Sequence, residues 1–320
     1  MNKTAFIFPG QGAQHIGMGH DFYKQVKESK RIFEQADDTL NMNLSDLIFN
    51  GEEEDLRKTE NTQPAILTTC MAILKALEKE GIDCQYTAGL SLGEYSSIVM
   101  SKALDFSDAL KVVRQRGKFM QEAVPYGLGG MAAILGMDRK FLPILLKESK
   151  DYGLVEVANY NSPEQIVLSG ELKGIRIACE KALKLGAKRA LELPVSAPFH
   201  TSLLSPAGER LSHILKEVKI NEPNKTVITN VDGESIKDKS EISSKLVNQV
   251  SSSVLWQQSV EYMINDGVNT FVEIGPGKSL TGFVKRIGKS MDKDIKALSI
   301  SNMDTFHKAL DKLDNIREGA

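Results

Sequence analysis

The chain has 320 residues and carries 40 lysine and arginine residues against 42 acidic ones, a net charge of −2. Because positive and negative charges nearly cancel, the chain has no general attraction to nucleic acid or to an anionic membrane, and we expect neither as a partner. The hydrophobic share of 41% excludes a largely disordered chain, and the length favours one large domain with a smaller one inserted or appended.

Cys70, Cys84 and Cys179 are widely spaced, and no two of them form a C-x-x-C pair. An odd number of separated cysteines argues against a disulfide framework and a zinc site, so we expect no bound metal and a reducing, cytoplasmic location. The N-terminal apolar run is too short for a signal peptide. No apolar stretch reaches the roughly 18 residues of a membrane span, so we expect none.

The first strand is predicted at 4–8, where an apolar run ends at Pro9 and Gly10. The loop that follows, GQGAQ, presents backbone N–H groups and could face other loops at the carboxyl ends of a parallel sheet. Helical patterns cover 23–40 and 64–80, and Gly81 favours a helix end there. A further strand is predicted at 86–90, directly before the serine-containing turn described next.

Ser91 lies between Gly89 and Gly93 in a G-x-S-x-G pattern, where a strand is expected to give way to a helix over 92–100. Glycines at both positions let a sharp turn expose the serine without a clash from a neighbouring Cβ. The hydroxyl would stand at a helix N-terminus, which favours developing negative charge. Such patterns also occur by chance at ordinary turns, but strand, turn and helix coincide here, so we interpret Ser91 as a nucleophile for a carbonyl carbon.

A helix is predicted over 107–124, with its apolar positions on one face. Arg116 lies at the margin of that face, and Arg114 lies nearer to solvent. An arginine at such a margin usually extends its head into water, and the helix pattern alone favours this interpretation. The alternative is that Arg116 reaches into a cleft and binds a carboxylate through two parallel N–H donors.

The segment 127–195 differs from the rest of the chain in the order of its predicted strands and helices. Strands are predicted at 130–135, 154–159, 165–169 and 188–193, with helices over 139–149 and 175–185. This β-α-β-β-α-β order is typical of a ferredoxin-like unit, so we predict an inserted ferredoxin-like subdomain at 127–195. The segments 1–126 and 196–320 are predicted to form one discontinuous α/β domain with a mostly parallel sheet, its later strands at 226–231 and 270–274.

His200 follows this subdomain and directly precedes a predicted amphipathic helix. A helix N-terminus disfavours imidazolium, which would keep His200 neutral and able to act as a general base. His15, after the glycine loop, is the only serious alternative among the five histidines. His213 and His307 fall in helical patterns, and His20 falls in a polar stretch.

Together these residues resemble the acyltransferase family of fatty acid and polyketide synthesis, which includes the malonyl-CoA:acyl-carrier-protein transacylases. The resemblance spans nearly the whole chain. It rests on GQGAQ (10–14), GLSLGEY (89–95), RQRGKFMQ (114–121), ANYNSPEQIVLSG (158–170), PFH (198–200), NQVSSSVLW (248–256) and EIGPGKSL (273–280), in that order.

The resemblance implies a role for each matching residue. Ser91 would carry the acyl group, and His200 would be its base. The backbone N–H groups of Gln11 and Leu92 would form the oxyanion hole, and Arg116 would bind the malonyl carboxylate.

The resemblance also implies that Gln249 orients His200 through its carbonyl oxygen and that Asn161 lines the cleft. Phe199 fits the pattern associated with malonyl rather than methylmalonyl units. The core would be similar to an α/β-hydrolase sheet. Leu90 replaces a histidine and Ser253 a proline that are common in the family, and both departures concern substrate placement rather than bond making.

The implied reaction transfers a malonyl group from malonyl-CoA to the phosphopantetheine thiol of acyl carrier protein, through a malonyl-serine intermediate and without a bound cofactor. It would supply fatty acid or polyketide elongation, and we expect a monomer. The alternative is a serine thioesterase or esterase of the α/β-hydrolase type, which shares G-x-S-x-G. A non-catalytic scaffold is a third interpretation.

Overall fold

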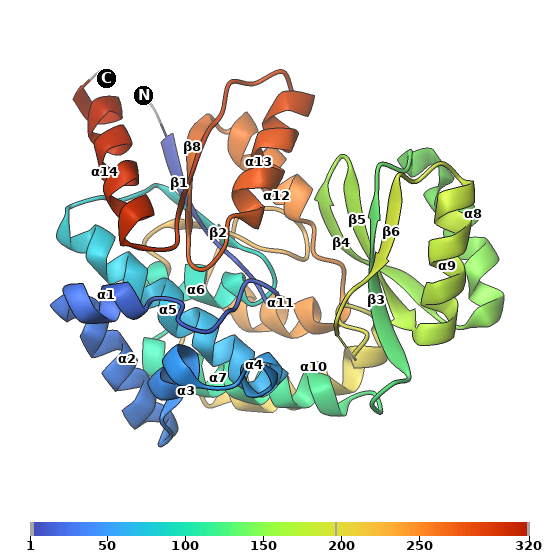
Figure 1. Cartoon of the computed structure of the whole chain (residues 1–320), viewed down its shortest axis with the longest axis horizontal. Helices are drawn as coiled ribbons and strands as arrows, with labels where there is room; N and C mark the ends of the chain where they lie inside the picture. The colour runs from blue at the N-terminus through green and yellow to red at the C-terminus, as the bar shows by residue number, and fades with distance from the viewer. Residues whose placement is uncertain (1–2, 196, 319–320) are drawn as a thin grey trace.

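Two sheets, each covered by helices, form the scaffold (Figure 1). The structure is a computed structural model that describes residues 3–195 and 197–318. Its strands are β1 (Lys3–Phe8), β2 (Tyr86–Gly89), β3 (Gly129–Leu135), β4 (Val155–Ser162), β5 (Gln165–Glu171), β6 (Arg189–Glu192), β7 (Thr226–Ile228), β8 (Val268–Ile274) and β9 (Lys296–Ile300). Its helices are α1 (His20–Gln25), α2 (Lys27–Leu40), α3 (Leu44–Asn50), α4 (Glu53–Arg57), α5 (Thr59–Lys79), α6 (Gly93–Met100), α7 (Phe106–Glu122), α8 (Leu142–Ser149), α9 (Leu172–Lys184), α10 (Ser205–Lys216), α11 (Ser240–Ser251), α12 (Trp256–Asn265), α13 (Ser279–Ser290) and α14 (Met303–Glu318), and short 3-10 turns cover Arg139–Phe141, Lys150–Tyr152 and Ser202–Leu204.

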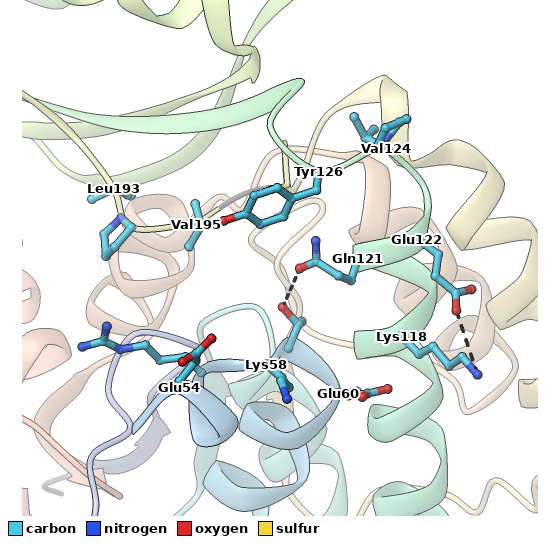
Figure 2. A pocket seen from close by; sticks show the side chains of 14 residues that line it. Glu54, Lys58, Glu60, Lys118, Gln121, Glu122, Val124, Tyr126, Leu193 and Val195 are labelled. Carbon is cyan, nitrogen blue, oxygen red and sulfur yellow. Dashed lines mark hydrogen bonds and ion pairs between the residues drawn. The ribbon is translucent and has the colours of Figure 1, made fainter. Parts of the chain in front are cut away.

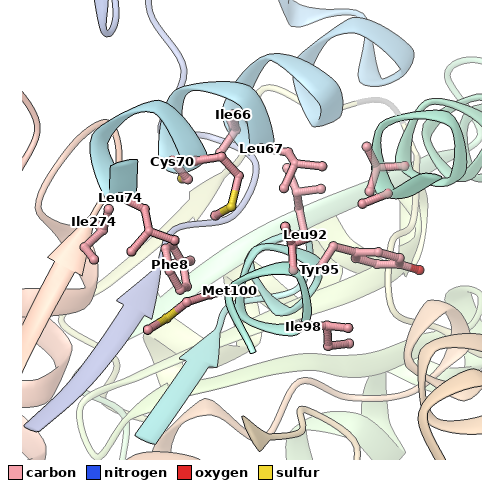
Figure 3. Packing of buried hydrophobic residues seen from close by; sticks show 14 of the residues in the cluster. Phe8, Ile66, Leu67, Cys70, Leu74, Leu92, Tyr95, Ile98, Met100 and Ile274 are labelled. Carbon is pink, nitrogen blue, oxygen red and sulfur yellow. The ribbon is translucent and has the colours of Figure 1, made fainter. Parts of the chain in front are cut away.

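The larger sheet is parallel throughout, in the order β7-β2-β1-β8-β9. The central strand β1 sends Phe6 and Phe8 into one hydrophobic core and Ala5 and Ile7 into another, and all four are buried. A strand that is apolar on both sides needs helices on both faces of its sheet. Figure 3 shows the first of these cores, where α5 and α6 pack around Phe8.

The smaller sheet is antiparallel, in the order β4-β5-β3-β6, and shares a third core with α8 and α9. Backbone hydrogen bonds join it to the segment between α11 and α12. The N–H of Tyr160 donates to the Val254 carbonyl at 3.0 Å, and the N–H of Val254 donates to the Ala158 carbonyl at 2.7 Å. Strand β4 is therefore fixed against the part of the chain that follows Gln249.

The predicted α/β class, with a mostly parallel sheet and a second group of strands, is confirmed. The predicted helix 23–40 is interrupted at Val26, whose backbone is extended (φ −120°, ψ 113°), and α5 begins at Thr59 with Pro64 inside it. The predicted helix end at Gly81 is confirmed, because Gly81 has φ 70° and the Ile82 N–H donates back to the Leu77 carbonyl. None of the helices in the described ranges has the length and apolar content of a membrane span.

The connections of the larger sheet create a crevice at the carboxyl ends of its strands. From β1 the chain continues to β2 on one side of the sheet, and from β8 it continues to β9 on the other side. The loops that follow β1 and β8 therefore run in opposite directions and leave a space between them. Ligands bind at such a switch point in open parallel sheets. The loop after β1 and the turn after β2 meet here, as predicted, since a Cβ on Gly10 would lie 2.5 Å from the Leu90 carbonyl oxygen.

Candidate active site

Ser91 lies in the turn between β2 and α6 with φ 51°, in the left-handed region that residues other than glycine rarely adopt. Two side-chain amides hold this strained backbone. Asn230 Oδ1 accepts from the Ser91 N–H at 2.6 Å, and Gln249 Nε2 donates to the Ser91 carbonyl at 3.0 Å. Asn230 also donates from Nδ2 to the Gly89 carbonyl at 2.7 Å. The turn is therefore held by the segment after β7 and by α11, and these contacts stabilise a backbone conformation that would otherwise relax.

The two glycines of the turn are required by close packing. A Cβ on Gly89 would lie 1.9 Å from the carbonyl carbon of Gly93, and a Cβ on Gly93 would lie 2.1 Å from the carbonyl oxygen of Phe8. Both contacts are with backbone atoms, which cannot move without shifting β1 or α6.

We expect Gly93→Ala to lower the free energy of unfolding by about 3 kcal/mol or more, because it overpacks a site with no free space. The measurement is chemical denaturation followed by circular dichroism. Gly282→Ala in α13 is the matched control, since a Cβ there would meet only the Arg286 guanidinium, at 3.6 Å. The control should be neutral or stabilising by up to about 1 kcal/mol. Equal unfolding midpoints for wild type and Gly93→Ala would contradict this account of the turn.

His200 forms a pair with Ser91. Its Nε2 lies 2.7 Å from Ser91 Oγ, and its Nδ1 lies 2.8 Å from the carbonyl oxygen of Gln249. A carbonyl oxygen can only accept, so Nδ1 carries the proton and Nε2 is free to accept the proton of the serine hydroxyl. This is the arrangement of a nucleophile and its general base.

The imidazole is kept neutral by burial. His200 is 4% exposed, and burial, followed by the positive charge of Arg116, lowers its pKa to about 4. The sequence-based reason was a helix that starts soon after His200. The 3-10 turn Ser202–Leu204 and then α10 do follow it, but burial is the larger cause of the lowered pKa. The alternative base His15 is exposed and bonds to the Ala13 carbonyl at 3.4 Å, away from Ser91.

Arg116 is 1% exposed, so the solvent-facing position that the helix pattern favoured is wrong. Its Nη1 donates to Gln63 Oε1 at 2.9 Å, and its Nη2 donates to Gln249 Oε1 at 2.9 Å and to Ser91 Oγ at 3.2 Å. The arginines that form ion pairs in the described ranges are others, on the surface. Within the described residues its hydrogen bonds go to neutral oxygens, and its guanidinium lies 5.4 Å from the centre of the Tyr95 ring. A buried cation without a carboxylate in contact is costly, and the carboxylate of a ligand would compensate it.

A cavity of about 320 Å³ opens beside these groups. Its lining combines residues from the two sheets and includes these predicted site residues: Gln11, Ser91, Leu92, Arg116, Asn161, Phe199 and His200. Gln249 lies behind them, fully buried and outside the lining. Within the described part of the chain, no acceptor pairs with the backbone N–H of Gln11 or of Leu92, so both remain available to a ligand.

A larger cavity of about 940 Å³ lies next to this one, between the first residues of α5, the end of α7 and the segment after β6 (Figure 2). The two cavities share Leu193 and Val195 as lining residues. The larger one has mixed charges and, among the residues that the structure describes, contains no member of the Ser91 group. The chemistry therefore belongs to the smaller cavity.

The two departures from the family pattern lie in different places. Leu90 lines the Ser91 cavity. Ser253 is outside it, and its hydroxyl donates to the carbonyl of Val157 in β4. Ser253 thus contributes to the contact between the smaller sheet and the segment that follows α11.

The sequence-based reasoning missed Gln63, Glu94 and Asn230. Gln63 and Asn230 are described above, and Glu94 Oε2 accepts from Gln249 Nε2 at 2.7 Å. Asn230 could have been found, because a polar residue soon after a buried strand lies at the same sheet edge as the Ser91 turn. The sequence gives no comparable sign for Gln63. Residues 3–195 and 197–318 hold no group of three or more His, Cys, Asp or Glu suited to a metal ion.

Comparisons with known proteins agree over the whole chain. The profile of the family described as acyl transferase domain matches residues 5–317. The malonyl CoA-acyl carrier protein transacylase of Bacillus subtilis (strain 168) is 46% identical over 321 residues, which is 100% of both chains. The crystal structure of malonyl CoA-acyl carrier protein transacylase from Clostridium perfringens has a TM-score of 0.94 at 47% identity and covers 98% of both chains.

A solved malonyl-transacylase in complex with its type II PKS acyl-carrier protein has a TM-score of 0.93 at 37% identity, with 97% of this chain and 100% of that chain covered. These similarities extend over both sheets and over the residues that surround Ser91. The chain therefore belongs to the acyl transferase domain family.

Proposed function

We propose that the protein transfers the malonyl group of malonyl-CoA to the phosphopantetheine thiol of acyl carrier protein. One observation carries this proposal: Arg116, a buried cation without a carboxylate partner, lies 3.2 Å from the hydroxyl of a serine that is paired with a neutral histidine. A thioester that ends in a free carboxylate satisfies both groups at once. The similar proteins from Bacillus subtilis and Clostridium perfringens are named for this activity.

In the first half of the reaction, His200 Nε2 takes the proton of Ser91 Oγ as the oxygen attacks the thioester carbonyl. The N–H groups of Gln11 and Leu92 stabilise the oxyanion. The carbon–sulfur bond then breaks, CoA leaves with the proton from His200, and a malonyl-serine ester remains. In the second half, the phosphopantetheine thiol attacks this ester and Ser91 is regenerated. The protein's own side chains suffice for these steps, without a bound cofactor.

The other site residues hold the reactants in place. Arg116 binds the malonyl carboxylate, and Gln249 fixes His200 through its carbonyl oxygen. Asn161 and Phe199 line the space around the acyl group, and Phe199 favours malonyl over methylmalonyl. Support for these roles comes from the lining of the cavity and from the 2.8 Å contact between Gln249 and the imidazole.

A serine hydrolase is the weaker alternative. In α/β-hydrolases an Asp or Glu holds the base, whereas the Nδ1 of His200 contacts a backbone carbonyl. A neutral carbonyl stabilises imidazolium less than a carboxylate would. This base is therefore better suited to exchange between thiols and a serine ester than to the activation of water.

For the architecture, we propose a ferredoxin-like subdomain at 127–195 inserted into a hydrolase-like domain formed by 1–126 and 196–320. Support comes from the strand order β4-β5-β3-β6 with two helices and from a strained serine directly after a parallel strand. Residues 1, 2, 196, 319 and 320 of these ranges lie outside the described residues. We further propose that the protein acts in the cytoplasm as a monomer, in fatty acid or polyketide elongation.

Intact-mass spectrometry tests the reaction. After incubation with malonyl-CoA, the protein should gain the mass of one malonyl group, and Ser91→Ala should gain none. Addition of acyl carrier protein with its phosphopantetheine should return the enzyme to its original mass and malonylate the carrier. Release of free malonate at the full turnover rate without the carrier would instead assign the protein to the hydrolases.

A further inference from the structure

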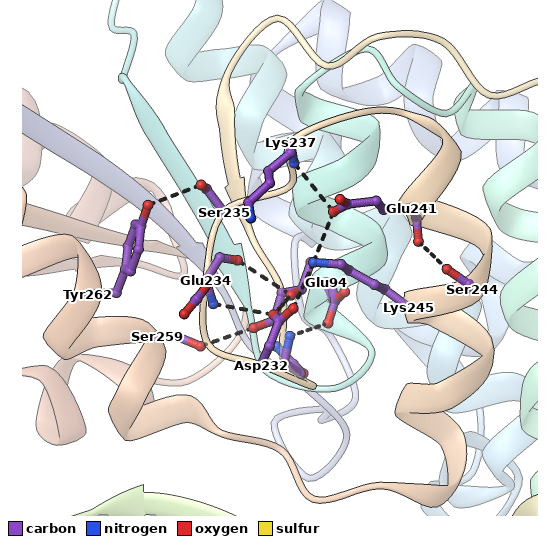
Figure 4. A network of polar contacts seen from close by, with 12 residues as sticks. Glu94, Asp232, Glu234, Ser235, Lys237, Glu241, Ser244, Lys245, Ser259 and Tyr262 are labelled. Carbon is purple, nitrogen blue, oxygen red and sulfur yellow. Dashed lines mark hydrogen bonds and ion pairs between the residues drawn. The ribbon is translucent and has the colours of Figure 1, made fainter.

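Glu94 is a buried carboxylate beside the nucleophile that the steps above do not use. It lies in the first turn of α6 and is 1% exposed. Its Oε2 accepts from Gln249 Nε2 at 2.7 Å and from the Asn230 N–H at 3.0 Å. Its Oε1 is buried and has no hydrogen-bond partner in the described part of the chain. Figure 4 shows Glu94 beside the polar groups that follow β7, among them Asp232.

Gln249 connects Glu94 to Arg116. The side-chain oxygen of Gln249 accepts from Arg116 Nη2 at 2.9 Å, and its nitrogen donates to Glu94. Only this orientation of the amide satisfies both neighbours, because a guanidinium only donates and a carboxylate only accepts. The negative charge of Glu94 therefore lies one amide group away from the cation that faces the cavity.

We infer that Glu94 is a specificity-determining residue that limits how tightly Arg116 holds the carboxylate of the malonyl group, so that the group leaves Ser91 as readily as it arrives. This inference rests on the proposed malonyl transfer. A transferase loses rate in its second half-reaction if it binds the acyl intermediate too tightly. Glu94 opposes such binding, because it partly compensates Arg116 and repels a second carboxylate in a site of low dielectric.

The substitution Glu94→Gln tests the charge with little change in shape. Glutamine keeps an oxygen for Gln249 and for the Asn230 N–H, and it places its NH₂ where Oε1 has no partner. Wild type and variant are equilibrated at pH 8.5 with a fixed ratio of malonyl-CoA to CoA, and the malonylated fraction is read by intact mass. We expect the ratio of malonyl-enzyme to free enzyme to rise about fivefold or more in Glu94→Gln. Loading from acetyl-CoA, which lacks the carboxylate, should not change.

Glu273→Gln is the matched control. Glu273 is also a buried carboxylate, but it accepts from the N–H groups of Leu280 and Thr281 at the start of α13 and has no link to Arg116. This variant should lose stability and keep the wild-type ratio of malonyl to acetyl loading.

The wild type provides a second measurement, which does not depend on whether Glu94→Gln folds. Burial raises the pKa of Glu94 to about 7, against the hydrogen bond from Gln249 and the charge of Arg116. The other groups around it do not change protonation state between pH 6 and 8.5. Tyr95 stays neutral because burial raises its pKa, Asp232 stays charged because hydrogen bonds from Lys245 and Thr229 lower its pKa, and His200, with a pKa of about 4, stays neutral. As the pH falls through 7, Glu94 gains a proton, and wild-type malonyl loading should rise relative to acetyl loading. Ionisation of the CoA thiol affects both acyl groups equally and cancels in this ratio.

The outcomes separate the charge of Glu94 from a structural role. Equal malonyl loading of wild type and Glu94→Gln, or an equal change in malonyl and acetyl loading, would overturn the inference. If the variant does not fold, a wild-type loading ratio that is constant between pH 6 and 8.5 would overturn it as well. If wild type forms no malonyl adduct on Ser91 at any pH, the proposed function fails, and not only the inference about Glu94.

Discussion

Replacing His200 with alanine should slow formation of the malonyl-enzyme about 10³- to 10⁴-fold, because His200 is the one base among the described residues that hydrogen-bonds to Ser91 Oγ. The residual rate would come from the oxyanion hole and from binding of the malonyl carboxylate, which the substitution leaves in place. The measurement is a rapid-quench time course with malonyl-CoA, read as the malonylated fraction by mass. His15→Ala, an exposed histidine outside the Ser91 cavity, should stay within about twofold of wild type.

The pH dependence of the wild type tests the same assignment without a substitution. The base must be neutral, and burial together with Arg116 lowers the pKa of His200 to about 4. With acetyl-CoA, whose loading does not depend on Glu94, the acylation rate should therefore stay constant as the pH falls to about 5 and be halved near 4. A half-point near 6.5, the ordinary pKa of histidine, would show that the imidazole is not shielded.

The same shift in pKa affects stability. The unfolded chain binds a proton at this histidine near pH 6.5, whereas the folded chain binds it only near 4. Between these values the unfolded state holds more protons, so stability is lost as the pH falls through this window, by up to about 3 kcal/mol. Circular dichroism at each pH would separate unfolding from loss of the base.

The fold could be predicted where the signal is local. The strand before Pro9 and the turn at Ser91 were predicted correctly. An apolar run and two spaced glycines indicate them without any information on the segments that pack against them. The short helices α3 and α4, of 7 and 5 residues, were missed. Helices of this length show too little periodicity and are stabilised mainly by packing on the rest of the chain. β9 and α14, at the end of the chain, were also missed.

The site could be predicted only in part. Ser91 as a nucleophile and His200 as the preferred base were each predicted from local patterns. Their pairing joins segments far apart in the sequence, and the resemblance to a known family supplied it. The helix pattern placed Arg116 near solvent, because a pattern cannot show that α5, the Ser91 turn and α11 enclose the end of that side chain. The amide contacts of Gln249 depend on the relative positions of α6, α7 and α11, which no single stretch of sequence specifies.

Replacing Arg116 with alanine should lower kcat/KM for malonyl-CoA by about 100-fold or more, the cost of about 3 kcal/mol that follows when a buried carboxylate loses its partner. Acetyl-CoA has no carboxylate, so its transfer should change far less. The readout is the ratio of kcat/KM for malonyl-CoA to that for acetyl-CoA. This ratio is preferred to either rate because the substitution also leaves oxygens of Gln63 and Gln249 without their donor.

Two further arginine variants define the role of the Arg116 guanidinium. Arg114→Ala removes the other arginine of the same part of α7, which contacts the sulfur of Met42 and lies outside the cavity, so the malonyl preference should persist. Arg116→Lys keeps the charge but loses the planar pair of donors, and its preference should fall between wild type and Arg116→Ala. If Arg116→Ala keeps the full malonyl preference, another group binds the carboxylate, and the burial of a cation beside Ser91 without a carboxylate in direct contact loses its functional explanation.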